Sequence, residues 1–299
     1  MTDSAAGGIE FPETTLGSDP ERLDLPPDEP GIVGGCTAVD LLFVLDNSAS
    51  MQTHHKALAD AFPTFITAIF ERLPHGTDVH VGLTTTDVAC KGPDCTCEDS
   101  TVGCQTAATS ESILSVYAPP EAGSNGVNGS QGRLIRTEGL VYFEASTVDD
   151  PADLIAWFTA SAESTGEDGC SFEMPVAAAG FVADPANAGT NAGFIRDAGA
   201  ALVVFVLTDE SDKSPELVDT YINRLRQAKK ICGGDVCISA AAILPSCVTG
   251  EAQSLWRFLT AFGEDPIVGD ITDPSVYAEV IQNALAIAVT SACAGVPVP

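Results

Sequence analysis

Two short runs of apolar residues dominate the hydrophobic pattern of the chain. Residues 41–45 and 201–207 are rich in Val, Leu and Phe, with no polar residue inside them. Runs of this length without polar alternation predict strands buried on both faces, as in a parallel sheet covered by helices. An aspartate follows each run, Asp46 directly and Asp209 after one threonine. Open α/β sheets bind ligands at the carboxyl ends of their strands, so both aspartates mark a candidate site.

The rest of the pattern alternates between helical and strand-like segments. Apolar residues at helical spacing predict helices over about 50–73, 151–161, 172–182, 215–230, 251–262 and 274–293. Strand-like segments cover residues 78–86, 134–145, 236–244 and 267–271. Pro63 predicts a kink or a break in the first helix. This order predicts an α/β fold, a doubly wound and mostly parallel six-stranded sheet with one antiparallel edge strand and helices on both faces.

Three oxygen-bearing side chains follow the first buried strand at alternate positions. The motif Asp46-x-Ser48-x-Ser50 offers one carboxylate and two hydroxyls within five residues. Hard oxygen donors with few charges suit Mg²⁺, Mn²⁺ or Ca²⁺ better than zinc. The alternative is that these residues cap the next helix, because Asp and Ser favour that position.

This motif, with the second strand end at Asp209, resembles the von Willebrand factor type A (vWA) family and its metal-ion-dependent adhesion site. The resemblance covers residues 36–293 in element order. It implies a vWA-type fold and a divalent cation, Mg²⁺ first with Mn²⁺ or Ca²⁺ as alternatives, held by Asp46, Ser48, Ser50, Thr165 and Asp209. It also implies a protein ligand that offers an acidic residue to the metal.

Two positions depart from the family pattern. Glu210 follows Asp209 where the family has glycine, and Thr165 lies in the unusual context Thr-Gly-Glu-Asp-Gly-Cys. Glu210 and Asp212 are either groups that support the metal ligands or first-turn acids of the next helix, favoured by its dipole, and we expect the latter. More narrowly, Phe-Glu-Met-Pro at 172–175 and Leu-Thr-Asp-Glu-Ser-Asp at 207–212 are similar to cysteine-bearing surface proteins of gliding soil bacteria, which implies an adhesin or a surface-complex component.

Ten cysteines in 299 residues indicate disulfide bonds. The spacing Cys90-x4-Cys95-x-Cys97-x6-Cys104 lacks the paired knuckles of zinc sites, so disulfides are favoured over zinc. Cys232 and Cys237 form a plausible local pair. In the expected fold the first strand begins where the last helix ends, which predicts a Cys36–Cys293 bond. We expect the remaining six to gather near the metal, with connectivity open: Cys90, Cys95, Cys97, Cys104, Cys170 and Cys247.

Two segments fall outside the regular pattern. Residues 1–35 are acidic and rich in Pro and Gly, which predicts a disordered linker that holds the domain of residues 36–299 away from an anchor. Residues 88–133 form a cysteine-rich insertion in the hairpin between the second and third strands. By topology the insertion emerges beside the metal, so it is either a recognition element or a surface excursion without a partner.

The net charge and the lack of long apolar stretches limit the partners and the location expected for the protein. The 42 acidic and 13 basic residues give a net charge of −29, which disfavours nucleic acid and anionic membranes as partners. No apolar stretch is long enough to span a bilayer. Residues 1–35 contain no signal-like apolar segment, so either a signal has been removed or the protein is cytoplasmic with reduced thiols. The cysteines favour the first, an extracytoplasmic protein that is secreted or at the cell surface, with an outer-membrane lipoprotein as one form.

Enzyme motifs are also missing. The sequence has no phosphate-binding P-loop, dinucleotide-binding glycine motif, His-Glu-x-x-His or nucleophile elbow, so we expect a binding module and not an enzyme. A metal-dependent hydrolase that uses Asp46 and Asp209 is a weaker alternative, because a base and a nucleophile are not evident. A structural domain with a vestigial metal site is the third possibility.

Overall fold

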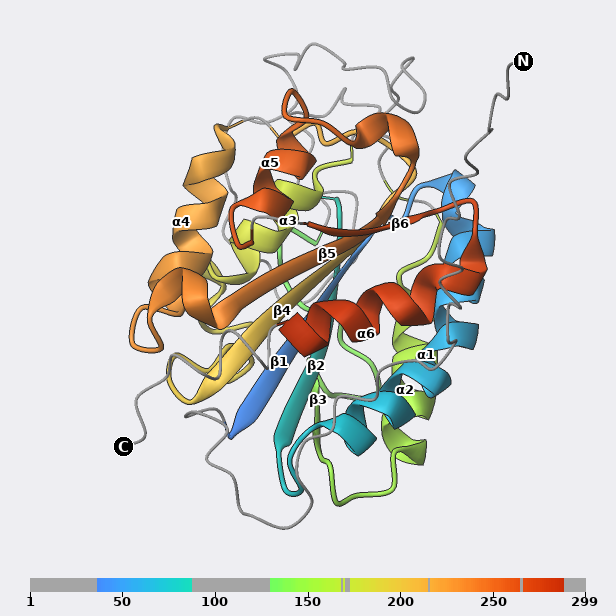
Figure 1. Cartoon of the computed structure of the whole chain (residues 1–299), viewed down its shortest axis with the longest axis vertical. Helices are drawn as coiled ribbons and strands as arrows, with labels where there is room; N and C mark the ends of the chain where they lie inside the picture. The colour runs from blue at the N-terminus through green and yellow to red at the C-terminus, as the bar shows by residue number, and fades with distance from the viewer. Residues whose placement is uncertain are drawn as a thin grey trace, which may run out of the picture. The chain divides into compact units, whose positions relative to one another are not determined.

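A six-stranded sheet forms the centre of the computed structural model (Figure 1). The structure describes residues 37–87, 130–167, 169, 173–214, 216–263 and 266–287, all within the unit Val33–Pro299. The strands are β1 (Ala38–Leu45), β2 (Asp78–Thr85), β3 (Phe143–Ser146), β4 (Ala200–Leu207), β5 (Ile238–Leu244) and β6 (Ile267–Asp270). Their order is β3-β2-β1-β4-β5-β6, and every neighbouring pair is parallel except β2 and β3. The predicted fold class is confirmed.

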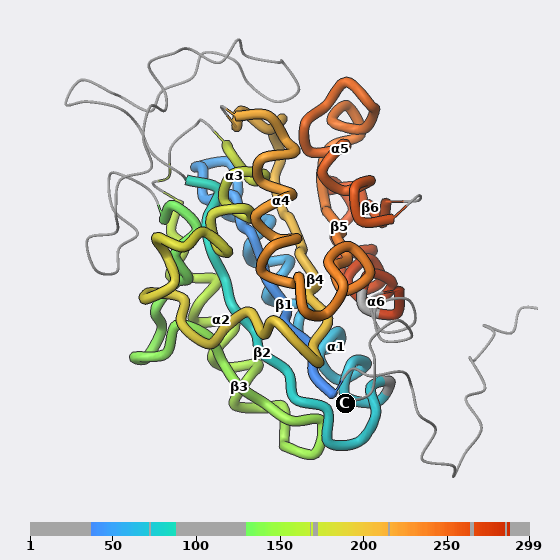
Figure 2. The backbone as a smooth tube through the Cα atoms, turned by 90° about the vertical axis from the view of Figure 1, so that its left-hand side faces the viewer, coloured from blue at the N-terminus to red at the C-terminus, as the bar shows by residue number. Residues whose placement is uncertain are grey.

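Helices cover both faces of this sheet because alternate strand residues point to opposite sides. Phe43 belongs to a core with α1 (Gln52–Arg72), α2 (Ala152–Ser164) and α6 (Tyr277–Ile287). Val44 belongs to a second core with α3 (Pro175–Val182), α4 (Val218–Ala228) and α5 (Ser254–Thr260). Figure 2 shows the side of the sheet that carries α3, α4 and α5, with the strands following one another from β3 at one side to β6 at the other.

Of the predicted kink or break at Pro63, the break is wrong, because helix α1 continues through this residue, whereas the kink stays a prediction. A proline inside a helix costs about 3 kcal/mol. Against that cost, the helix buries Phe62, Phe65, Ile66 and Ile69 completely. Each fully buried side chain of this kind contributes about 1.5–3 kcal/mol, so the apolar stripe outweighs the lost hydrogen bond.

The edge strand β3 is shorter than the hydrophobic pattern predicts and begins at a later residue. Strand β3 covers only Phe143–Ser146, whereas the strand-like residues extend over 134–145. A tight turn closed by hydrogen bonds between Thr137 and Leu140 interrupts the segment. Glu138 and Gly139 take positive φ angles of 52° and 88° in this turn, which an extended strand does not allow.

The described residues test only some of the disulfide predictions. The local pair Cys232–Cys237 is confirmed as a disulfide bond. Cys247 is also disulfide-bonded and lies in the short helix η4 (Ser246–Val248), after β5 and so at the carboxyl ends of the parallel strands. Other predictions lie outside the described residues: the linker 1–35, most of the insertion 88–133, and Cys36, Cys90, Cys95, Cys97, Cys104, Cys170 and Cys293.

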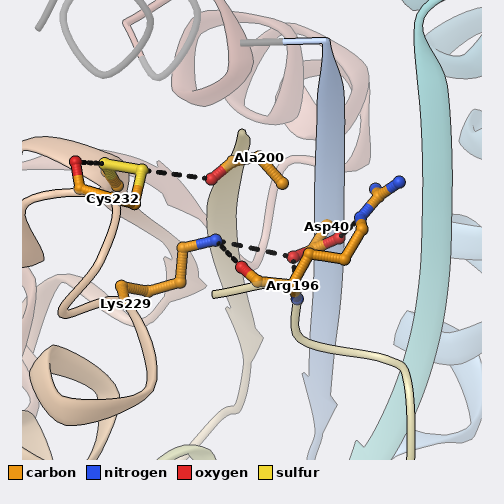
Figure 3. The surroundings of a disulfide bond; sticks show 6 residues. Asp40, Arg196, Ala200, Lys229 and Cys232 are labelled. Atoms are coloured by element: carbon orange, nitrogen blue, oxygen red, sulfur yellow. Dashed lines mark hydrogen bonds and ion pairs between the residues drawn. A yellow bond between two sulfur atoms is a disulfide. The ribbon is translucent and has the colours of Figure 1, made fainter. Parts of the chain in front are cut away.

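A buried ionic cluster fixes the amino end of β1 (Figure 3). Asp40 is fully buried, and its Oδ1 accepts a hydrogen bond of 2.7 Å from Nε of Arg196. The Nζ atom of Lys229 lies 3.7 Å from Oδ2 of Asp40 and donates to the carbonyl oxygen of Arg196. Burial lowers the pKa of Lys229, opposed by the charge of Asp40. The cluster ties β1 to the segment before β4 and to the end of α4.

Within the part of the chain that is described, no helix combines the length and apolarity needed to cross a bilayer.

Candidate metal centre

Three residues form a row at the carboxyl ends of β2, β1 and β4. Leu45, the last residue of β1, pairs with Thr85 of β2 and Leu207 of β4. The ladder continues for one more step, because the Thr86 amide donates to the Leu45 carbonyl (3.0 Å) and the Asp46 amide donates to the Leu207 carbonyl (2.9 Å). Thr86, Asp46 and Thr208 therefore lie side by side, one residue past the three strands.

Asp46 is fully buried at the centre of this row. Its Oδ1 accepts from the Ser48 amide (2.9 Å), and its Oδ2 accepts from the Thr208 hydroxyl (2.8 Å). Burial raises the pKa of Asp46 to about 6, and the charge of Asp209 adds to this effect against the two hydrogen bonds. Within the described ranges no lysine or arginine pairs with Asp46. The carboxylate therefore lacks a compensating positive charge from these residues.

The two serines of the motif face each other. Their hydroxyl oxygens lie 3.0 Å apart, with Ser48 buried and Ser50 exposed. Ser48 is at the N-cap position of the short helix η1 (Ala49–Met51), but its side chain makes no capping hydrogen bond. Helix α1 follows with Met51 at its N-cap, also without a side-chain cap. The Ser48 hydroxyl is therefore not used to cap η1 and is instead within hydrogen-bond distance of the Ser50 hydroxyl.

Asp209 reaches the same place from β4. It follows Thr208, and its charge acts on Asp46 strongly enough to affect the Asp46 pKa. Its Oδ1 is buried and has no hydrogen-bond partner among the described residues. Asp46, Ser48, Ser50 and Asp209 thus follow the carboxyl ends of the neighbouring strands β1 and β4, and their role as metal ligands stays a prediction.

Thr165 approaches from another direction. It is the C-cap residue of α2, and its hydroxyl donates to the Ala162 carbonyl (2.6 Å). Its Oγ1 also lies 3.4 Å from Nδ1 of His55, whose Nε2 donates to the Asp46 carbonyl (2.5 Å). Thr165 is therefore connected to Asp46 through His55, and its role as a ligand stays a prediction.

Sequence reasoning did not identify Glu173 as part of this site. Its side chain is fully buried just before α3, and the Thr86 hydroxyl donates to its Oε2. Burial raises its pKa well above the ordinary value, and the charges of Asp46 and Asp87 raise it further. A carboxylate directly before the apolar run 174–182 was the available signal in the sequence.

Glu210 and Asp212 follow β4, and their side chains interact with groups outside the next helix, α4. Oε2 of Glu210 lies 2.6 Å from Nζ of Lys213 in a buried ion pair. Asp212 accepts a hydrogen bond from the Val176 amide in the first turn of α3 (3.1 Å). The expectation that both are first-turn acids of the next helix is wrong, since Glu210 pairs with Lys213 and Asp212 caps α3.

The donors present fit a divalent cation that prefers oxygen. Two carboxylates and two hydroxyls follow the neighbouring strands β1 and β4, and a buried oxygen of Asp209 is left without a donor among the described residues. In that same part of the chain, no three His, Cys, Asp or Glu side chains converge in a cluster that could hold a metal ion. Hydroxyls and water must complete the coordination sphere, which suits Mg²⁺ better than zinc.

Comparison with known proteins gives only distant likenesses. No protein-family model and no curated protein matches the chain. A crystal form of proximal thread matrix protein 1 from the mussel byssus is 12% identical, with a TM-score of 0.46 over 86% of this chain and 49% of that one. Another structure of that protein, described as having a zinc-occupied MIDAS motif, is 13% identical, with a TM-score of 0.41 over 85% of this chain and 46% of that one.

A von Willebrand factor type A structure from Catenulispora acidiphila is 17% identical, with a TM-score of 0.39 over 85% of this chain and 43% of that one. The chain thus spans about half the length of each of these proteins, or less. No functional residue is transferred from them, and the conclusions about the site rest on its own geometry.

Proposed function

We propose that the chain is a protein-binding module that uses a divalent cation, Mg²⁺ in the first place, at the carboxyl ends of β1 and β4. The observation that carries the proposal is the buried Asp46, which accepts from Thr208, the neighbour of Asp209, and pairs with no lysine or arginine in the described residues, beside two facing serine hydroxyls. Asp46, Ser48, Ser50 and Asp209 would hold the ion, in part through water, and Thr165 is the further candidate from the resemblance. A carboxylate of the partner protein would fill the open coordination position.

Binding fits this site better than catalysis. A hydrolase needs a base that can reach a substrate or a metal-bound water. The two histidines near the site are both engaged, since His55 donates to the Asp46 carbonyl and His54 lies 3.1 Å from the Tyr277 hydroxyl. Burial also lowers the pKa of His55, so this residue is neutral at pH 7. Metal-dependent adhesion requires only the ion and an accessible coordination position.

The proposed setting is extracytoplasmic. Disulfide bonds persist in oxidising compartments, and Cys232, Cys237 and Cys247 are all disulfide-bonded. Residues 1–35 would serve as the linker to a cell-surface anchor. The net charge of −29 repels acidic proteins at long range. The partner therefore carries a local acidic residue for the metal within a surface that is otherwise neutral or basic.

Calorimetric titration with Mg²⁺ and Mn²⁺ tests the proposal. We expect the protein to bind one ion and Asp46→Ala to abolish binding, because the central carboxylate is lost. Asp60→Ala is the matched control, since Asp60 is an exposed aspartate on α1 that pairs with Lys56. It removes the same charge away from the site and should bind normally. A wild-type protein that binds no divalent ion, or an Asp46→Ala variant that binds as well as wild type, would leave only the structural alternative.

A further inference from the structure

The backbone around Glu173 spans the gap between β2 and the segment after β4. The amide of the next residue, Met174, donates to the Thr86 carbonyl (3.2 Å) just past β2. The carbonyl of Glu173 itself accepts from the Lys213 amide (2.8 Å) in the segment after β4. Because β1 lies between β2 and β4 in the sheet, this bridge places Glu173 over the end of β1, where Asp46 lies.

The side chain of Glu173 is held from one side only. Thr86, which stands next to Asp46 in the row of strand ends, donates its hydroxyl to Oε2. Glu173 is 0% exposed, yet its other oxygen, Oε1, has no hydrogen-bond partner among the described residues. A buried polar group left without a partner costs about 1–3 kcal/mol. Lys213, whose amide donates to the Glu173 carbonyl, pairs its Nζ atom with Glu210.

Thr86 and Thr208 play matching roles on the two sides of Asp46. Thr208 donates its hydroxyl to Asp46, and Thr86 donates its hydroxyl to Glu173. Val44 and Val206 face the α3 layer, and Asp46 and Thr208 continue the same alternation two residues later. Glu173 precedes α3 directly, so its carboxylate and that of Asp46 lie on the same side of the sheet end.

We propose that Glu173 belongs to the metal site, where its Oε1 accepts a hydrogen bond from a water molecule on the bound cation. This inference rests on the proposed function. The contact runs through water because no three acid side chains converge on one point in the described ranges. Mg²⁺ keeps several of its waters in protein sites, whereas Ca²⁺ takes more oxygens directly from the protein. Glu173 therefore favours Mg²⁺ over Ca²⁺.

This arrangement also supplies the oxygen that the resemblance assigns to Thr165. The Thr165 hydroxyl already donates to the Ala162 carbonyl, whereas Oε1 of Glu173 has no donor in the described part of the chain. Glu173 acts on the metal through water and so is a positioning residue of the site.

Glu173→Gln tests the inference, because it keeps the shape of the side chain and removes its charge. We expect the variant to bind Mg²⁺ about 10–100-fold more weakly than wild type in calorimetry, the usual effect of removing a partner of a metal-bound group. The loss for Ca²⁺ should be smaller. In EDTA, the variant should unfold at the same or a higher temperature than wild type. Glu163→Gln, the same change at an exposed position on α2, is the control and should bind Mg²⁺ normally.

The outcomes separate the two proposals. If wild type binds Mg²⁺, Asp46→Ala does not and Glu173→Gln binds within about twofold of wild type, Glu173 is excluded from the site and the proposed function stands. A wild-type protein that binds no divalent ion overturns both. If Glu173→Gln does not fold, Glu173→Met, which is uncharged and of similar length, gives the same decision.

Discussion

Gly132 occupies a position where a side chain has no room. Its φ is +75°, and a Cβ atom there would lie 2.4 Å from the carbonyl carbon of Phe181. We expect Gly132→Ala to lower the free energy of unfolding by about 2–4 kcal/mol, because left-handed strain adds to a clash with backbone. Urea denaturation measures the loss. Gly139→Ala is the control, since Gly139 has a φ of +88° but nothing within 4 Å. Equal losses in the two variants would show that the clash contributes nothing.

Asp212 gives the stability of α3 a pH dependence. Burial raises its pKa from 3.8 to about 6, against its hydrogen bonds to Ser214 and Val176. The folded state then holds the proton more tightly than the unfolded state. The resulting stabilisation is present below about pH 4 and is lost as the pH rises to about 6. We expect wild type to lose about 1–3 kcal/mol relative to Asp212→Asn over this window. Urea denaturation of both proteins at pH 4, 5 and 6 measures the difference, and parallel curves would contradict it.

The site residues differ in how far sequence could identify them. Asp46, Ser48 and Ser50 follow one predicted buried strand and Asp209 follows another, so the strand pattern, with the resemblance, made them candidates for one site. Glu173 follows no strand. Its position depends on bonds to Thr86 and to the segment at Lys213, and such contacts between distant segments leave no periodic signal in the sequence.

At the scale of elements, β1 depends on the ionic cluster at its amino end. Asp40→Ala would leave Arg196 and the fully buried Lys229 without their shared carboxylate. We expect a loss of about 3–5 kcal/mol in the free energy of unfolding, because removing one partner leaves uncompensated buried charge. Asp78→Ala, at an exposed position at the start of β2, should stay within about 0.5 kcal/mol of wild type. A loss below about 1 kcal/mol for Asp40→Ala would show that the cluster does not stabilise β1.

Buried strands were the most predictable elements. Residues 41–45 and 201–207 lie within β1 and β4, because apolar runs of that length have few other interpretations. The edge strand β3 was less predictable, since an edge strand is half-buried and a turn at Glu138 and Gly139 decides where it begins. In α1, local propensity at Pro63 was overridden by tertiary packing.

At the scale of the whole molecule, the predicted insertion 88–133 lies between β2 and β3, and only its ends belong to the described residues. The described residues on its two sides meet beside the site, where the Gln131 amide donates to the Asp87 carbonyl (3.0 Å). Asp87 in turn accepts from Nδ2 of Asn47, the neighbour of Asp46 (2.9 Å). Residues 130–133 are buried, and the Ser130 hydroxyl lies within hydrogen-bond distance of Thr84 and Thr85. These four residues therefore belong to the folded body of the domain.

This boundary defines a sharper deletion. We expect replacement of residues 91–129 by an Asn-Gly turn to leave folding and Mg²⁺ binding intact and to abolish capture of the partner from surface extracts. Circular dichroism, calorimetry and a pull-down with and without EDTA measure the three properties. A longer deletion that also removes residues 130–133 should lower thermal stability and serves as the contrast. Full partner binding by the shorter protein would show that the insertion is not a recognition element.

Sequence predicted the fold of the whole molecule but not its partner. The order of the helices and strands, together with the apolar runs that mark buried strands, determines the topology of the sheet. Recognition, by contrast, depends on the surface around one coordination position, which hydrophobic periodicity does not encode.

The buried aspartates at the two ends of β1 differ in their charged neighbours. Asp40 has two cationic neighbours, whereas Asp46 has none in the described part of the chain. A metal that binds only the folded state at 100 times its dissociation constant adds about 2.7 kcal/mol of stability. Where proteases cut the transiently opened chain, this lowers the cleavable population about a hundredfold. If the proposed site binds its ion, the lifetime of this protein against proteases would rise with the concentration of divalent cations around it.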